Sequence, residues 1–202
     1  IVQPDRVVQN AKRFMGDPHK SWVIDGKVYR PADISALILR HMLQSAEEQL
    51  GPIRHAVITV PAQFSDLQRQ DTIEAGHLAG LDKVEVINEP VAAALCYVLG
   101  SEGTWFSELA GEQTIMVYDL GGGTFDLSLV RYSKNAVNVV HSAGDLHLGG
   151  IDWNAALQEY ACEQFVREVP DDPRLDRQSM QTLANHGEQC KRELGERPKA
   201  EA

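Results

Sequence analysis

The residues of this sequence best suited to chemistry lie between Tyr118 and Asp126 and read YDLGGGTFD. Three consecutive glycines lack a Cβ, so backbone N–H groups can converge there on an anion such as a phosphate. Thr124 adds a hydroxyl donor, and the carboxylates of Asp119 and Asp126 can hold a metal ion or its waters. The segment therefore predicts a nucleotide phosphate site, although a simple hairpin turn would be favoured if the glycines stood alone.

The residues around the glycines indicate which kind of phosphate site this is. A dinucleotide-binding loop needs a third glycine where Asp126 stands, and the Gly-Lys-Ser/Thr of a P-loop is absent. The flanking runs, Thr114 to Leu120 and Thr124 to Tyr132, both have the composition of strands. A strand, a glycine turn and a second strand indicate the phosphate hairpin of the actin-like ATPases.

The first half of the chain predicts a hairpin followed by a βαβ unit. Asp25-Gly26, between two β-prone runs in Trp22 to Tyr29, is a strong hairpin signal. A helix is predicted from Pro31 to about Leu50, where Gly51-Pro52 ends it. The βαβ unit consists of a strand at His55 to Val60, a helix that the Ser65/Gln68 capping box opens and that runs toward Gly80, and a strand at Val84 to Ile87.

The second half predicts further strands and helices. Pro90 suits the first position of a helix at Val91 to Leu99 and leaves Glu89 at its N-terminal end. Gly100 to Gln113 has the composition of a loop. We expect an α/β fold with mixed sheets flanked by helices. Its remaining elements are a strand at Val137 to Ser142 and helices at about Asp152 to Arg167 and Gln178 to Leu194.

Composition and charge narrow the class of protein. The 19 Lys and Arg residues against 29 Asp and Glu give a formal charge of -10, which predicts no binding to nucleic acid or to membranes. No apolar run reaches the roughly 20 residues that span a bilayer. Cys96, Cys162 and Cys190 are widely spaced, which favours a reducing, cytoplasmic setting. The seven scattered histidines predict no His-bound metal.

Separate segments along the whole chain resemble, in the same order, the DnaK-type heat-shock 70 kDa chaperones. The resemblance implies the central part of a nucleotide-binding domain with the actin-like ATPase (ribonuclease H-like) fold, incomplete at both ends. It implies a first half at residues 1–118 and the start of a second half at 119–202. The matching segments are Ala11-Lys12-Arg13, Ile58 to Ala62 with Gln68 to Gln70, Ala75-Gly76 with Ala79 to Leu81, Asn88 to Pro90 with Ala92 to Ala94, Asp119 to Asp126, and Gly144-Asp145 with His147 to Gly150.

The resemblance implies hydrolysis of ATP to ADP and phosphate with magnesium held mostly through water. Lys12 would reach the γ-phosphate and the attacking water, and Glu89 would orient a metal-bound water. Asp119 and Asp126 would lie near the ion, and Thr124 would donate to the γ-phosphate. On residue type alone, Lys12 could equally be a surface lysine and Glu89 a helix-capping carboxylate.

The remaining nucleotide contacts implied by the resemblance come from glycines and from the last helix. Glu188, Lys191 and Arg192 would clasp ribose and adenine, although a solvated charged face would have the same composition. Gly195 stands where the family usually has a serine that bonds the adenosine. Gly121, Gly122, Gly123, Gly149 and Gly150 complete this set of nucleotide-binding residues.

The resemblance also implies a conformational cycle and partners. Pro61 and Arg69 match a relay between the nucleotide and a separate peptide-binding domain, which would hold unfolded peptide clients. A J-domain co-chaperone and a nucleotide-exchange factor are expected. Gln63 replaces the usual tyrosine, and the Gly100 to Gln113 loop, with Trp105 and Phe106, is longer than usual. These departures indicate a divergent bacterial member.

Two other functions belong to the same superfamily. A sugar kinase would position a sugar hydroxyl in place of water, and an actin-like protein would assemble into filaments. Asn88-Glu89-Pro90 and Gly144 to Gly150 argue against both. Because the opposing phosphate loop of the family is expected before Ile1, we expect this fragment alone to be inactive as an ATPase.

Overall fold

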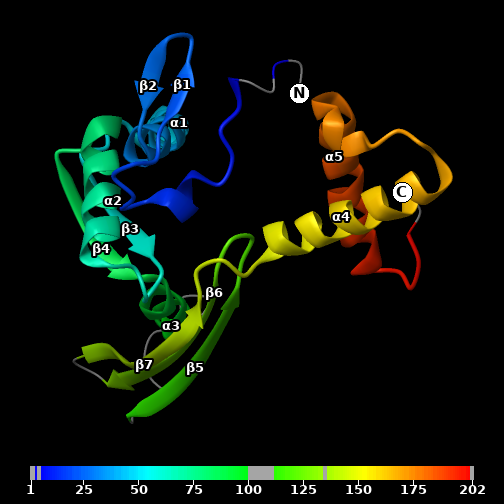
Figure 1. Cartoon of the computed structure of the whole chain (residues 1–202). Helices are drawn as coiled ribbons and strands as arrows, with labels where there is room; N and C mark the ends of the chain where they lie inside the picture. The colour runs from blue at the N-terminus through cyan, green and yellow to red at the C-terminus, as the bar shows by residue number, and fades with distance from the viewer. Residues whose placement is uncertain (1–2, 4–5, 100–111, 134–135, 201–202) are drawn as a thin grey trace. The chain divides into compact units, whose positions relative to one another are not determined.

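The computed structural model describes residues 3, 6–99, 112–133 and 136–200 (Figure 1). The chain divides into two compact units. The larger holds Gln3–Leu120 and Thr124–Leu146, and the smaller holds Gly121–Gly123 and the chain from His147 onward. Most of the predicted loop between Gly100 and Gln113, including Trp105 and Phe106, lies outside the described residues. Within the part of the chain that the structure describes, no helix has the length and apolar character needed to cross a membrane.

A hairpin and a long helix open the larger unit. β1 (Trp22–Ile24) and β2 (Lys27–Tyr29) pair antiparallel, and the turn residues Asp25 and Gly26 have φ angles of 51° and 76°. Two successive positive φ angles are what a type I′ turn requires. α1 (Pro31–Leu50) then begins, with Asp33 accepting a hydrogen bond from the Arg30 backbone N–H at 2.7 Å. The predicted hairpin and helix are both confirmed.

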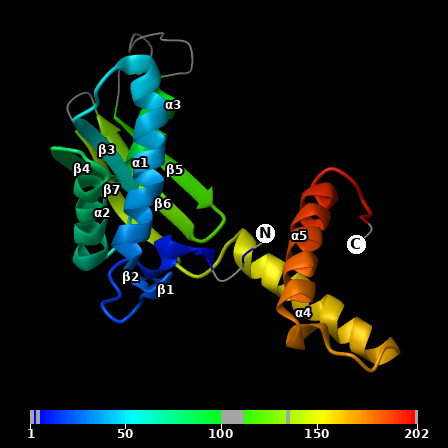
Figure 2. The ribbon, with the colours of Figure 1, turned by 90° about the horizontal axis from the view of Figure 1, so that it is seen from above.

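The predicted βαβ unit is also confirmed. β3 (His55–Val60) and β4 (Lys83–Asn88) pair in parallel, and α2 (Asp66–Ala79) connects them. The capping box closes as expected, since the Ser65 N–H donates to Gln68 Oε1 at 2.8 Å and the Gln68 N–H donates to Ser65 Oγ at 3.4 Å. α1 and α2 lie side by side (Figure 2) and pack through the small side chains of Ala32, Ala36 and Ala75.

A helix and a three-stranded sheet complete the larger unit. α3 (Glu89–Leu99) precedes β5 (Gln113–Leu120), β6 (Phe125–Ser133) and β7 (Ala136–Asp145), which pair antiparallel in that order. The expected mixed sheets are not seen among the described residues, because parallel and antiparallel strands lie in separate sheets. α3 contacts the parallel sheet, β3 and β4, and also the antiparallel sheet, β5 to β7. It therefore joins the two sheets by packing instead of by strand pairing.

The smaller unit is a pair of packed helices. α4 (Gly150–Glu168) and α5 (Arg177–Leu194) are joined through the short 3-10 helix η3 (Pro173–Leu175). Both helices begin within two residues of their predicted starts. Asp176 caps α5 by accepting from the Ser179 N–H at 2.8 Å, as a helix start requires.

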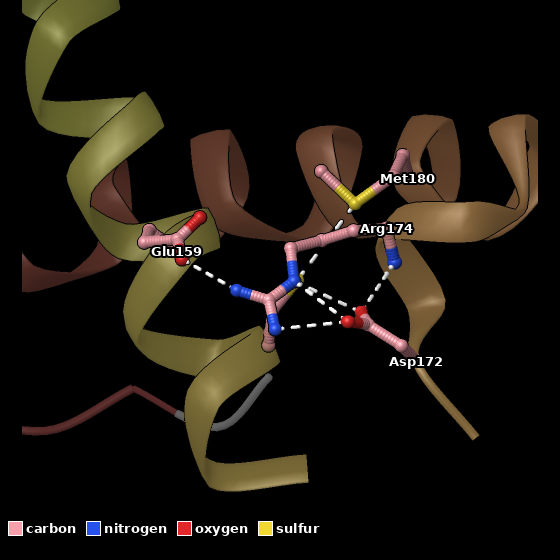
Figure 3. Close-up of polar contacts among 5 residues, drawn as sticks. Glu159, Asp172, Arg174 and Met180 are labelled. Atoms are coloured by element: carbon pink, nitrogen blue, oxygen red, sulfur yellow. Dashed lines mark hydrogen bonds and ion pairs between the residues drawn. The ribbon is translucent and has the colours of Figure 1, made fainter. Parts of the chain in front are cut away.

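Arg174 ties this connection to α4 (Figure 3). Its Nη1 donates to Glu159 Oε1 at 2.6 Å and its Nη2 to Asp172 Oδ2 at 2.9 Å. Hydrogen bonds from Arg174 lower the pKa of the Asp172 carboxyl. Nearby, the buried thiol of Cys162 on α4 lies 3.7 Å from Met180 Sδ on α5. Arg174 therefore holds η3 against α4, and the Cys162–Met180 contact holds α5 there.

Candidate nucleotide site

Lys12 and Glu89 form an ion pair in the larger unit. Lys12 lies on the 3-10 helix η2 (Ala11–Phe14), and Glu89 is the first residue of α3. Lys12 Nζ is 2.9 Å from Glu89 Oε1, and the two side chains are 52% and 19% exposed. A carboxylate at a helix N-terminus interacts favourably with the helix dipole. The structure thus brings together two predicted site residues that are 77 positions apart in the sequence.

Asp119 and Asp126 face each other across β5 and β6. Like charges in such a cross-strand pair repel. Asp126 is only 2% exposed, and both its carboxylate oxygens are buried without a hydrogen-bond partner. Burial raises the pKa of the Asp126 carboxyl, the charges of Glu89 and Asp119 raise it further, and Lys12 opposes the rise. Acidic groups from α3, β5 and β6 are therefore electrostatically coupled.

The Asp126 carboxylate fits the chemistry of a cation site. Buried carboxylate oxygens without partners are costly unless a cation or water satisfies them. No group of three or more His, Cys, Asp or Glu side chains among the described residues could hold one metal ion directly. The arrangement suits a hydrated cation such as magnesium, which keeps several of its own waters.

Thr124 directly precedes β6, and Gly144 lies near the end of β7. Thr124 is 9% exposed. A Cβ on Gly144 would overlap the Phe125 carbonyl oxygen and the Gln63 side-chain nitrogen. Gln63, one of the departures from the family pattern, therefore lies directly against this end of the sheet.

The residues of the predicted relay lie after β3 and on α2: Pro61 directly follows β3, and Arg69 is on α2. Pro61 is fully buried. The Arg69 guanidinium donates to the carbonyl of Phe64 at 3.1 Å, to that of Ala62 at 3.3 Å and to Asn88 Oδ1 at 2.8 Å. Arg69 thus links the Pro61 segment to the residue that precedes Glu89.

In the smaller unit, the glycine run packs against the start of α4. The N–H of Gly150 donates to the Gly121 carbonyl at 3.1 Å, and that of Ile151 donates to the Gly122 carbonyl at 2.8 Å. A Cβ on Gly149 would lie 2.7 Å from Gly122 and Gly123 backbone atoms. Gly149 therefore allows the close approach that fixes the glycine run, whereas a Cβ on Gly150 would lie at an ordinary contact distance, 3.7 Å, from Gly122 Cα.

The charged residues near the end of α5 form a network with α4. Glu188 accepts hydrogen bonds from Lys191 Nζ at 2.7 Å and from Arg192 Nε at 2.9 Å. Lys191 Nζ also donates to the Gly150 carbonyl at 3.2 Å. Lys191, Asn154 and Arg192, in that order of effect, lower the pKa of Glu188 to about 2. Gly195 is the C-cap residue of α5.

Asn154 is a member of this network that the sequence did not predict. Its Nδ2 donates to Glu188 Oε2 at 2.5 Å, while its Oδ1 is buried without a hydrogen-bond partner. An asparagine in the first turns of a helix gives little signal in a single sequence, because its usual reading is a solvated or capping side chain. Asn154 joins the network only through Glu188 on α5, which lies 34 residues further along the chain.

Comparisons with known proteins identify the family. The family model for the Hsp70 protein matches residues 8–202, so the chain belongs to the Hsp70 family. It is 45% identical over 195 residues to the chaperone protein DnaK of Thermotoga neapolitana and 44% identical to those of Thermotoga petrophila and Thermotoga maritima. Each alignment covers 96% of this chain but 31% of the relative. The match does not favour the sugar kinase or filament alternatives.

Proposed function

We propose that this chain forms part of the nucleotide-binding domain of a DnaK-type chaperone and takes part in ATP binding and hydrolysis. The proposed fold is that of the actin-like ATPases, with one half at residues 1–118 and the start of the second at 119–202. The observation that carries the proposal is Asp126, a buried carboxylate whose oxygens lack partners and whose pKa is raised beside Glu89 and Asp119. Family membership and the fit to a hydrated cation support it.

The phosphate end of ATP would meet the residues of the larger unit. Lys12 would donate to the γ-phosphate and the attacking water, and Thr124 would add a hydroxyl donor. Glu89, already paired with Lys12, would accept from a water of the metal shell and so fix its orientation. Catalysis would come from positioning and charge stabilisation, since phosphoryl transfer to water needs no protein nucleophile.

Magnesium would neutralise charge on the phosphate oxygens when bound. Asp119 and Asp126 would hold it through its waters, together with Glu89. Binding of a cation would also relieve the repulsion across β5 and β6, which gives these carboxylates a physical reason to lie together.

The nucleoside end would meet the α4–α5 network. Glu188 stays ionised because three donors hold it, and an ionised carboxylate is a strong acceptor for ribose hydroxyls. Lys191 and Arg192 would complete the contacts to ribose and adenine, and Gly195 would lie beside the adenosine. Gly121, Gly122 and Gly123 would present backbone to the phosphates, supported by Gly149 and Gly150.

The wider biology is proposed on the same basis. Pro61 and Arg69 would relay the nucleotide state to a peptide-binding domain that holds unfolded clients. A J-domain co-chaperone and a nucleotide-exchange factor would regulate turnover, and the protein would act in the cytoplasm. The contacts of Arg69 with both the Pro61 segment and Asn88 support the relay.

Substitutions at the γ-phosphate end test the proposal. In the full-length protein, Lys12→Ala and Thr124→Ala should each lower the single-turnover rate of ATP hydrolysis by roughly 100-fold, because each removes a donor to the developing charge. The affinity for ATP, measured by calorimetry, should change much less. Unchanged single-turnover rates in both variants would remove these residues from the catalytic site.

A further inference from the structure

Helix α2 contacts the chain on both sides of the Lys12–Glu89 ion pair. One contact is the Arg69 side chain, which donates to Asn88 Oδ1 at 2.8 Å, one residue before Glu89. The other is the Asp71 side chain, which accepts a hydrogen bond from the backbone N–H of Gly16 at 2.7 Å. Gly16 lies two residues beyond η2, which carries Lys12.

The Gly16 contact is close and conformationally specific. Gly16 has a φ of +78°, which favours glycine, and a Cβ there would lie 2.8 Å from Gln68 Cγ and 3.1 Å from the Gln68 backbone nitrogen. The turn therefore rests directly on the first turn of α2. A hydrogen bond from a backbone N–H to a carboxylate is charge-assisted and stronger than one between neutral groups.

Side-chain packing makes this part of the chain stiff. Met15, between η2 and Gly16, is 6% exposed and packs in a core cluster with Val60 and Phe64. The Ser35 hydroxyl lies 3.4 Å from Met15 Sδ. At the end of η2, the N–H of Met15, its C-cap residue, donates to the Lys12 carbonyl at 3.3 Å. A shift of Gly16 would thus be transmitted to the backbone of Lys12.

We propose that Asp71 is a positioning residue for Lys12: it fixes the η2 turn on α2, so that one helix sets the places of both Lys12 and Glu89. The inference rests on the proposed function of Lys12 in hydrolysis. Asp71 is one of three acidic residues on α2, with Asp66 and Glu74, and Glu74 pairs instead with Arg30 at 2.6 Å. Asp71 is the one whose carboxylate holds the backbone beside η2.

Three variants of the full-length protein separate positioning from a general effect on stability. Asp71→Ala removes the acceptor and should lower the single-turnover hydrolysis rate by on the order of 10-fold, because small misplacements of a catalytic group are costly. Its affinity for ATP should stay within about 2-fold of the wild type. Asp71→Asn keeps an oxygen that can accept from Gly16 and should retain the rate. Glu74→Ala is the matched control, and it should also retain the rate.

A double-mutant cycle tests whether Asp71 acts through Lys12. Asp71→Ala should add no further loss in a Lys12→Ala background. The proposal would be overturned if Asp71→Ala lowered the rate as much in the Lys12→Ala background as in the wild type. It would also be overturned if Lys12→Ala slowed hydrolysis but Asp71→Ala kept the wild-type rate.

Amide exchange distinguishes failure of this inference from failure of the proposed function. In the 202-residue chain without nucleotide, Asp71→Ala should speed exchange of the Gly16 amide hydrogen, measured by NMR, whereas Glu74→Ala should not. If Lys12→Ala itself left hydrolysis unchanged, the proposed role of Lys12 would fail. The exchange rate of the Gly16 amide hydrogen would then still show whether Asp71 holds the turn. If Asp71→Ala left the exchange rate of the Gly16 amide hydrogen unchanged, the hydrogen bond between Gly16 and Asp71 would not hold this turn in solution, and the inference would fail.

Discussion

At the residue scale, Asp126 and Glu188 show opposite responses of a carboxyl group to its surroundings. Asp126 is buried opposite Asp119 without a hydrogen-bond partner, and its pKa is raised. Glu188 accepts from Lys191, Asn154 and Arg192, and its pKa is lowered to about 2. A carboxylate that is already satisfied can serve as a fixed acceptor, whereas an unsatisfied one favours a cation. The two environments therefore match different tasks.

Replacing Asp126 should show how much its buried negative charge destabilises the folded chain. A carboxyl with a raised pKa in the folded state lowers stability as pH rises from its unfolded pKa of about 3.8 through the folded one. Asp126→Asn should abolish this contribution and raise the thermal midpoint of the chain at pH 7 without magnesium. Thermal unfolding of both proteins between about pH 4 and pH 7 measures the difference. The prediction would be contradicted if the wild type had the higher thermal midpoint and its advantage over the variant grew as pH rose.

Glu188 should behave in the opposite sense. Its folded pKa of about 2 lies below the ordinary value of 4.5, so its contribution to stability is present above about pH 4.5 and is lost as pH falls toward 2. Glu188→Gln should remove this dependence and leave stability near pH 2 almost unchanged. NMR titration of the Glu188 carboxyl carbon measures the pKa directly, and an ordinary midpoint near 4.5 would show that the α4–α5 network does not form in solution.

At the element scale, much of the secondary structure could be predicted from local signals. The Asp25-Gly26 turn, the Ser65/Gln68 capping box and the Pro90 helix start each act within a few residues, so a single sequence reveals them. The separation of parallel and antiparallel strands could not be predicted, because strand pairing is decided by contacts between residues far apart in the sequence. In the candidate site, the spacing of the glycine run and its two aspartates is enough to predict them. Asn154 and Asp71 could not be predicted, because their hydrogen bonds reach residues far away in the sequence.

The packing of the glycine run against α4 makes Gly149 a sensitive position. Its φ of 178° suits any residue, so an effect of substitution must come from crowding. Gly149→Ala would place a Cβ 2.7 Å from Gly122 and Gly123 backbone atoms, which should cost about 1–3 kcal/mol of stability. Gly122→Ala is the matched control, because no atom lies within 4 Å of a Cβ there. Chemical denaturation of the two variants measures the difference, and equal stability would argue against the close approach.

At the scale of the whole molecule, the chain spans 31% of the length of the DnaK relatives compared above, and its candidate residues belong to two compact units. Core packing differs between them. Among the described residues, the larger unit contains two clusters of buried apolar side chains, whereas α4 and α5 contain three buried residues, Gly150, Cys162 and Gly187. The contacts between α4 and α5 include the polar bonds Asn154–Glu188 and Lys191–Gly150 and the Cys162–Met180 sulfur contact.

The 202-residue chain by itself should bind magnesium-ATP in the millimolar range or more weakly and should show no measurable steady-state hydrolysis. The Lys12 side chain is 52% exposed, and Gly122 is open to solvent with no neighbouring atom within 4 Å of its Cβ position. Donors in such an open, high-dielectric setting stabilise a phosphate much less than donors in an enclosed one. Calorimetry with magnesium-ATP and a phosphate-release assay, each with Lys12→Ala as the control, measure binding and turnover. Micromolar binding that Lys12→Ala abolishes would contradict this prediction and would show that the 202-residue chain already forms a complete ATP-binding site.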